Sequence, residues 1–204
     1  NCVSVQPVET EFGRKRTIDQ SSCNTALSCL DGFCPAFVTV HGGRPKRVEA
    51  RAEIGNYFPP LPEPEIPRIG ERPYGILVAG VGGTGVVTIG AILGMAAHIE
   101  GKGCGSVDMA GLAQKGGTVY SHIKLAAKPE EIHAISISAG GADLVLGCDL
   151  VVSGTAKVLA AIRGRETGVI INTAEIYPGN LARDADFTLP SAEICDSIGV
   201  SWLC

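Results

Sequence analysis

The sequence predicts an α/β fold in which a mainly parallel sheet with flanking helices follows a small, irregular, cysteine-rich segment. Three observations lead to this prediction. Short apolar runs alternate with helical patterns from residue 73 onward, a proline-rich stretch precedes them, and four of the eight cysteines lie within the first 34 residues. Strands that alternate with helices are typical of parallel sheets.

The cysteine-rich segment, residues 1–57, contains four thiols that suit a metal cluster. They are Cys2, Cys23, Cys29 and Cys34. Four thiolates are the number that a [4Fe–4S] cluster takes, and a Cys-Pro step after the last one is typical of bacterial ferredoxin segments. No C-x2-C pair and no histidine lies among them, which disfavours zinc. Because the rest of the chain resembles a cytosolic protein, we prefer a cluster to disulfides or plain burial.

A connector follows at residues 58–72, and it separates the two parts of the chain. Five of the ten residues in "FPPLPEPEIP" are proline, which excludes a helix or a central strand and favours a semi-rigid linker. We therefore place domain boundaries at 1–57, 58–72 and 73–204.

The elements of the last part follow from hydrophobic periodicity. Strands are expected at 76–79, 106–109, 119–125, on both sides of Gly147 within 143–152, and at 169–172, with helices at 84–98 and 155–163. In 119–125, apolar or small residues alternate with Tyr120, His122 and Lys124, which predicts a strand with one solvated face.

Two classes of partner are disfavoured by composition. The net charge is −4 and aromatic residues are few, so no basic or stacking surface indicates nucleic acid. Residues 74–99 contain no charge, but glycines near the start of this stretch divide it into a strand and a helix, so no membrane span is expected. The scattered thiols are interpreted as small buried hydrophobes: Cys104, Cys148, Cys195 and Cys204.

A glycine-rich turn joins the first strand to the first helix of this part. Its G-x-G-x-x-G pattern contains Gly80, Gly82, Gly83 and Gly85. Such a Rossmann-like turn lets backbone amides approach an anion at the helix N-terminus. Asp108 ends the second candidate strand, where a dinucleotide enzyme binds ribose. The same glycines also suit close helix–strand packing without a ligand, and both interpretations stay open here.

Four stretches resemble a known family: "SVQPVETEFGRKRTIDQSSCN", "GFCPAFVTV", "GILVAGVGGTGVVTIGAILGMAAHIEGKG" and "DMAGLAQKGGTVYSHIKL". They are similar to the single-chain indolepyruvate ferredoxin oxidoreductases of bacteria, in which the subunits of the archaeal enzymes are fused. The resemblance extends over nearly the whole chain. It implies that residues 1–57 end a ferredoxin-like segment and that 73–204 form a C-terminally incomplete gamma domain.

The resemblance implies oxidative decarboxylation of aryl-pyruvates such as indolepyruvate to acyl-CoA, with electrons passing through iron–sulfur clusters to ferredoxin. Thiamine diphosphate with Mg²⁺ would be bound mainly by domains preceding Asn1, and coenzyme A would be the co-substrate. The expected partners are ferredoxin, the remaining thiamine-binding domains and further copies of the chain, all in the cytoplasm. The fragment alone is expected to be inactive.

Site roles implied by the resemblance are limited. In a two-cluster arrangement Cys2, Cys23 and Cys29 would bind the second cluster and Cys34 the first, or all four would bind one cluster. The glycine turn would have no nicotinamide role. No catalytic residue is identified, since the histidines are isolated: His41, His98, His122 and His133.

Two alternatives to this enzyme remain. One is an NAD(P)-binding Rossmann module of a dehydrogenase or a regulatory protein, which depends on Gly80, Gly82, Gly85 and Asp108. The other is a non-enzymatic electron-transfer or assembly domain.

Overall fold

A computed structural model gives the fold of part of the chain. It describes residues 4–20, 23, 41–43, 63, 69–70, 72–111, 117–175, 177, 184 and 186–199. Contacts divide the chain into two compact units, Asn1–Cys23 with Ile69–Cys204, and Asn24–Arg68. Nearly all described residues belong to the first unit.

The first described element is a β-hairpin, which corrects the expectation that this part of residues 1–57 is irregular. β1 (Val5–Thr10) pairs antiparallel with β2 (Gly13–Ile18) in a two-stranded sheet. Gly13 has φ +86°, a backbone conformation that glycine adopts without a steric cost. Both strands are rich in polar and charged residues, so the apolar alternation that normally indicates a strand is missing.

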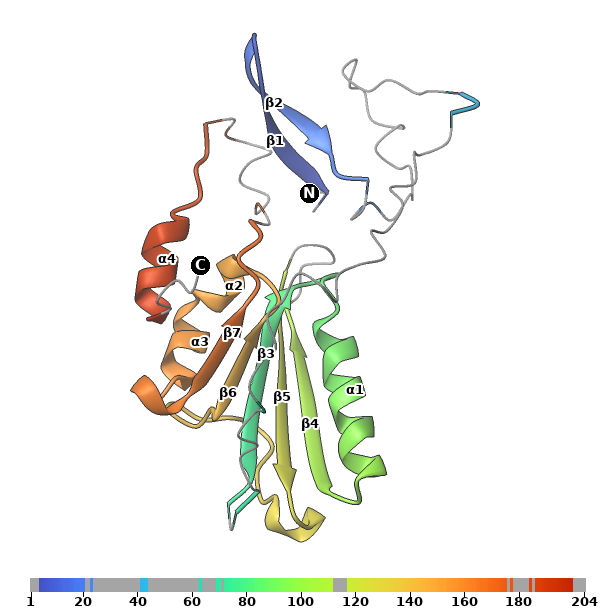
Figure 1. Ribbon diagram of the computed structural model, residues 1–204, viewed down its shortest axis with the longest axis vertical. Coiled ribbons are helices and arrows are strands. Elements are labelled where there is room, and N and C mark those ends of the chain that lie inside the picture. Colours follow the sequence, from blue (N-terminus) through green and yellow to red (C-terminus); the bar gives the residue numbers. More distant parts are fainter. Residues whose placement is uncertain are drawn as a thin grey trace. The chain divides into compact units, whose positions relative to one another are not determined.

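The α/β domain contains a five-stranded sheet in the order β4-β5-β3-β6-β7 (Figure 1). The strands are β3 (Tyr74–Val81), β4 (Gly103–Ala110), β5 (Thr118–Ala126), β6 (Leu144–Gly147) and β7 (Gly168–Ile171). β3, β6 and β7 run parallel to one another, as the sequence predicts.

The direction of β5 departs from the mainly parallel sheet that we expect from sequence. β5 lies between β4 and β3 and runs antiparallel to both. The reason is the link from β4 to β5, residues 111–117. A parallel neighbour needs a crossover connection of about a dozen or more residues, whereas a short link returns the chain antiparallel.

Helices cover both faces of the sheet. α1 (Val86–Ile99) packs on one face, over β3, β4 and β5, where the core contains Ile76, Val78, Val86 and Ile123. α2 (Leu150–Ser153) and α3 (Ala156–Ala161) contact β3. The core cluster on this side includes Leu77, Val145, Val152 and Val158. No helix in the described part of the chain is long and apolar enough to cross a membrane.

The remaining elements are short. They are η2 (Pro129–Glu131), η3 (Gly164–Glu166) and α4 (Ser191–Ile198), the last of which packs on α2. Residues 150–152 were predicted as strand from their apolar character and instead begin α2. The correction follows from Asp149, whose carboxylate accepts a hydrogen bond from the Val152 N–H at 2.9 Å and so caps the helix.

The predicted solvated face of β5 is wrong at two positions. Tyr120 is 9 % exposed and His122 is 3 % exposed. The Tyr120 hydroxyl contacts the Thr155 hydroxyl, and the Nδ1 atom of His122 accepts a hydrogen bond from the Ile137 N–H at 3.1 Å. The segment that leads to β6 and the start of α3 therefore cover side chains that alternation alone assigns to solvent.

An ion-pair network lies where β3 and β6 begin. The Asp143 carboxylate accepts a hydrogen bond from the Gly75 N–H at 2.8 Å and two from the guanidinium of Arg72. Arg163 approaches the same carboxylate at 3.5 Å. Asp143 raises the pKa of Arg72, chiefly through the hydrogen bond between the two side chains. The network ties the amino ends of both strands together.

Candidate functional site

The candidate site lies where β3 and β6 end. After β3 the chain passes through α1 to the β4 side of the sheet, and after β6 it passes through α2 and α3 to β7 on the other side. The two connections therefore diverge from neighbouring parallel strands. In open α/β sheets, ligands bind in the crevice at this topological switch point.

The glycine turn forms one side of this point. The Gly82 N–H donates to the Gly117 carbonyl at 2.8 Å, and the Thr84 N–H and hydroxyl both donate to the Val81 carbonyl, at 3.0 and 2.7 Å. Gly83 has φ +103° and Gly85 has φ +89°, so side chains at these two positions would be strained. The turn thus depends on glycine at two of the four predicted positions through backbone conformation.

The N-terminus of α1 opens onto a hollow of about 280 Å³. Its described lining residues are Val81, Gly82, Gly83, Gly85, Val86, Val87, Thr88 and Val119. Gly85 caps the helix without a side-chain hydrogen bond, and the first turn contains no acidic residue. Free amides and the positive end of the helix dipole favour an anion at this place. Thr88 adds a hydroxyl group, and none of these eight residues is charged.

Gly80 has a different role from the other three glycines. A Cβ atom at Gly80 would lie 2.7 Å from Thr84 Oγ1 and 2.8 Å from both Cys148 Cβ and Val86 Cγ2. Gly80 is absent from the described lining of the hollow. Its lack of a side chain permits the close approach of helix and strand, which is the packing interpretation of the motif. Gly82, Gly83 and Gly85 line the hollow itself.

Asp149 is the residue of this region that the sequence analysis missed. It is 0 % exposed, and its carboxylate accepts from the Val81 N–H at 2.7 Å and from the Val152 N–H at 2.9 Å. Burial raises the pKa of Asp149, while backbone hydrogen bonds oppose the rise. Asp149 joins the end of β3 to the start of α2. An aspartate shortly after a buried strand and directly before an apolar run is a helix-start signal that could have identified it.

Cys148 and Asn172 lie directly after β6 and β7, at the same end of the sheet as Asp149. Burial, with a contribution from Asp149, raises the pKa of the Cys148 thiol, which disfavours the reactive thiolate. The Asn172 side chain donates to the Cys148 carbonyl at 3.3 Å, so the segment after β7 is tied to the end of β6. Cys195 is buried, and Cys104 and Cys148 are half-buried, in keeping with their interpretation as small hydrophobes.

Asp108 does not join the glycine turn. β4 is the edge strand, and β5 separates it from β3. The Asp108 carboxylate lies 3.8 Å from the position of a Cβ on Gly90, in the middle of α1. In a dinucleotide-binding Rossmann fold the ribose-binding acid follows the strand next to the glycine turn. The geometry therefore removes one of the two features behind the nicotinamide alternative.

The predicted cluster ligands lie mostly outside the described residues. Cys23 is described and half-buried, while Cys2, Cys29 and Cys34 are not among the described residues. Within the described residues, no three His, Cys, Asp or Glu side chains gather as a metal site. Of the four histidines, His41, His98 and His133 are exposed and His122 is buried.

Comparison with known proteins gives one family match. The sequence profile described as pyruvate ferredoxin/flavodoxin oxidoreductase matches residues 75–200. The chain is 35 % identical over 130 residues to an indolepyruvate oxidoreductase subunit IorB of Methanothermobacter thermautotrophicus, covering 61 % of this chain and 60 % of the relative. It is 33 % identical over 103 residues to the IorB subunit of Archaeoglobus fulgidus, covering 50 % and 48 %. The chain thus spans between about half and three fifths of these relatives.

Two solved structures show limited similarity. The pyruvate oxidoreductase subunit PORC of Thermotoga maritima superposes with a TM-score of 0.41 at 16 % identity, over 51 % of this chain and 52 % of that one. The gamma subunit of a keto/oxoacid ferredoxin oxidoreductase from Geobacter sulfurreducens gives a TM-score of 0.27 at 27 % identity, over 36 % and 37 %.

Proposed function

The chain belongs to the pyruvate ferredoxin/flavodoxin oxidoreductase family, and from this premise we propose that it is one part of an enzyme that oxidatively decarboxylates 2-oxo acids. The substrate would be an aryl-pyruvate such as indolepyruvate, the products acyl-CoA and carbon dioxide, and the electron acceptor ferredoxin. The observation that carries the proposal is the family match over 75–200, the α/β domain, together with relatives named for indolepyruvate.

We propose that Cys2, Cys23, Cys29 and Cys34 hold iron–sulfur chemistry in the first part of the chain. Four thiolates fit a [4Fe–4S] cluster as a donor set. Such a cluster, when bound, passes electrons one at a time to ferredoxin. The order of the segment would then depend on the metal, because the binding free energy of a cluster contributes to folding.

We further propose that Gly82, Gly83, Gly85 and Thr88 accept an anionic group at the start of α1. Coenzyme A, the expected co-substrate, carries phosphates of the kind that helix N-termini bind. Gly80 and Asp149 would position the turn rather than contact a ligand. Thiamine diphosphate with Mg²⁺, which supplies the decarboxylation chemistry of this family, would be bound by other domains of the enzyme, since no charged side chain lines the described hollow.

The activity is tested with the chain in its complete enzyme. The enzyme, with this chain and its thiamine-binding domains, should reduce ferredoxin when indolepyruvate and coenzyme A are both added. Omitting coenzyme A should stop the reaction. The proposal fails if removal of this chain leaves the rate unchanged, or if none of a set of aryl and alkyl 2-oxo acids is oxidised.

The cluster is tested on the chain itself. Anaerobic reconstitution with iron and sulfide should give a broad charge-transfer absorption that Cys23→Ser and Cys29→Ser each abolish. Cys104→Ser, a half-buried thiol of β4, is the matched control and should leave the spectrum unchanged. Full absorption and iron content in the Cys23→Ser/Cys29→Ser double variant would refute the ligand assignment, as would stoichiometric zinc binding with no uptake of iron.

The anion site is tested by titration with coenzyme A and, separately, with NADH. Val87→Glu places a negative charge at the helix start, where it suits the helix dipole but repels an anionic ligand. Coenzyme A binding should be lost in this variant and retained in Val87→Gln. If NADH binds instead and Asp108→Ala abolishes that binding, the nicotinamide alternative replaces the proposal for this loop.

A further inference from the structure

The outer edge of the sheet at β4 is open over most of its length. Among the described residues, β4 pairs only with β5, from Gly103 to Ala110, so one of its edges has no strand partner in that part of the chain. Residues 106–110 are all exposed, including Val107 at 36 % and Met109 at 45 %. Natural edge strands are usually blunted by proline, lysine, a bulge or a covering segment. In β4 neither proline nor lysine occurs, and Asp108 is its single charged residue.

The hydrogen-bonding direction of each residue in β4 follows from one contact. The Gly111 N–H donates to the Thr118 carbonyl at 3.0 Å, so 111 and 118 form a hydrogen-bonded pair of the antiparallel ladder. Because such pairs alternate along a ladder, residues 105, 107 and 109 bond to β5. The backbone groups that point outward belong to Cys104, Ser106, Asp108 and Ala110.

These outward groups are complementary to a second copy of themselves. In an antiparallel pair of two β4 strands, Cys104 faces Ala110 and Ser106 faces Asp108 of the other copy, and the reciprocal pairs follow by symmetry. This register satisfies every outward backbone group of 104–110. It places Val107 against Val107 at the twofold axis. A shift by one pair in one direction would instead place Asp108 opposite Asp108, a like-charge pair that is destabilising.

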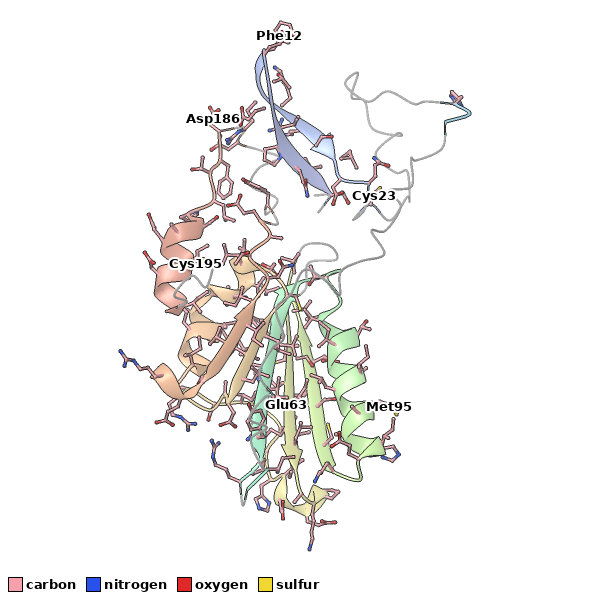
Figure 2. All side chains as sticks on the ribbon, viewed as in Figure 1. Phe12, Cys23, Glu63, Met95, Asp186 and Cys195 are labelled. Carbon is pink, nitrogen blue, oxygen red and sulfur yellow. The ribbon has the colours of Figure 1, made fainter. Side chains whose placement is uncertain are left out.

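The side of α1 that lies next to β4 would also allow two β4 strands to pair. Gly94 lies next to β4, since its Cβ position would be 3.7 Å from Cys104 Sγ. Val87, Ala91 and His98 share this flank by helical spacing and are exposed. α1 contains no Asp, Glu, Lys or Arg, so two copies of the helix can approach without repulsion between such charges. Figure 2 shows Met95 projecting from α1 away from the sheet, so it is not part of this flank.

We propose that β4 is a self-association surface: it pairs antiparallel with β4 of a second copy, with Ser106 opposite Asp108, so that two sheets become one continuous sheet. The occupant is a second copy because, in this register, the two Val107 side chains meet at the twofold axis and the two Asp108 carboxylates do not face each other. The backbone match permits this pairing, as at any antiparallel edge, and the side chains select it. The inference does not depend on the proposed catalytic function.

The backbone part of the proposal is tested with Ser106→Pro. Proline removes an outward N–H and leaves the ladder to β5 intact, which edge strands tolerate. Analytical ultracentrifugation over a concentration series should show a dimer for the whole chain and for Ser106→Ala, and a monomer for Ser106→Pro with an unchanged thermal melt. A wild-type chain that is monomeric at every soluble concentration, or a dimer that survives Ser106→Pro, overturns the proposal.

The register is tested by charge, without touching the backbone. Ser106→Asp creates two like-charge pairs per dimer and should weaken association roughly tenfold, on the scale of cross-strand charge pairs. Adding Asp108→Lys to the Ser106→Asp variant should restore association, because each aspartate at 106 then faces a lysine at 108 of the other copy. Ser106→Lys alone should tighten association. If Ser106→Asp and Ser106→Lys have the same effect, the register is wrong.

Amide hydrogen exchange identifies any other occupant. The N–H groups of Cys104, Ser106, Asp108 and Ala110 should become protected as the concentration rises. Protection that is complete in the monomer would mean that a segment of the same chain covers β4, and this result also refutes the proposal.

Discussion

β3 and β6 are joined at both ends by a buried aspartate, and the two ends use different partners. At the amino end Asp143 binds the Gly75 N–H and also the guanidinium of Arg72, whose side chain is 63 % exposed. At the carboxyl end Asp149 binds the Val81 and Val152 N–H groups, and no cation pairs with it in the described part of the chain. The amino end is therefore held partly by an ion pair whose arginine is exposed to solvent. The carboxyl end is held by buried backbone amides.

The difference separates an end that is open to solvent from the end at which we propose that an anion binds. An ion pair open to water responds to salt and pH, whereas backbone hydrogen bonds to a buried carboxylate do not respond to salt. The carboxyl end thus fixes the glycine turn without bringing a charged side chain to the hollow. A ligand with its own charge would meet amides and one hydroxyl there, which leaves recognition to the helix terminus.

The largest effect should come from Asp149→Ala. The Val81 and Val152 N–H groups would be left buried without a partner, at about 1–3 kcal/mol for each unsatisfied group. We expect the free energy of unfolding to fall by about 3 kcal/mol, equally at low and high salt, in denaturant titrations. Asp149→Asn keeps one acceptor oxygen and should lose less. A loss that shrinks in high salt would mean that an unseen cation pairs with Asp149.

Gly80→Ala should be the next most destabilising change. Three atoms would lie within 2.8 Å of the new Cβ, and overpacking of this kind costs roughly 1–3 kcal/mol. Gly85→Ala should cost about 1 kcal/mol through its φ of +89°. Gly82→Ala is the matched control, because its nearest neighbour is 3.4 Å away and it should shift the thermal melt least. Equal shifts for Gly80→Ala and Gly82→Ala would contradict the packing role.

Arg72→Ala tests the amino end and should have a smaller effect. Pairs with an exposed partner are worth up to about 1 kcal/mol, and this contribution should fall further in 1 M salt because the Debye length is then about 3 Å. Chemical denaturation at two salt concentrations measures it. Arg72→Lys should recover only part of the loss, since it cannot form the two-pronged contact with Asp143. If the loss of unfolding free energy in Arg72→Ala is the same at both salt concentrations, the contrast drawn between the Asp143 end and the Asp149 end is wrong.

The smallest effect concerns pH and His122. Burial, with repulsion from Lys157, lowers the pKa of His122 from its ordinary value of 6.5. The neutral ring accepts a hydrogen bond from Ile137, in the segment that leads to Asp143. Its stabilising contribution should therefore be complete above pH 6.5 and be lost as the pH falls through the lowered pKa. Below about pH 6.5 the melting temperature of the wild type should fall more steeply with decreasing pH than that of His122→Asn. If the melting temperatures of the two proteins change with pH in parallel, the pKa of His122 is the same in the folded and the unfolded protein, and the prediction is wrong.

Local patterns predicted the elements with strong local signals. The apolar run 76–79, the glycines after it and the helical spacing of 84–98 together gave β3, the turn and α1 nearly to their ends. The direction of β5 was not predictable from its own residues, because strand direction depends on the length of the link and on pairing with distant strands. The polar strands of the hairpin, β1 and β2, lack the periodicity that reveals a buried face.

The candidate site was also predicted only where its residues carry a local signal. Gly82, Gly83 and Gly85 line the hollow as a glycine turn implies, whereas Gly80 serves packing. Asp149 lay within an apolar run that suggested strand, and the helix-start signal that it carries was outweighed. Asp108 was linked to the turn by sequence order, but the insertion of β5 separates them in the sheet. The cluster ligands other than Cys23 lie outside the described residues, so their assignment remains a prediction.

The order of strands in the sheet also has a consequence for biosynthesis. β3 is the central strand, and both of its neighbours, β5 and β6, are translated after it. A ribosome adds about 5–20 residues per second, so the apolar strand waits for several seconds before β6 emerges to cover its second edge. During this interval the nascent chain exposes an unpaired edge of β3, which is the kind of surface that makes chaperones necessary. A shortage of chaperones should therefore lower the yield of soluble protein.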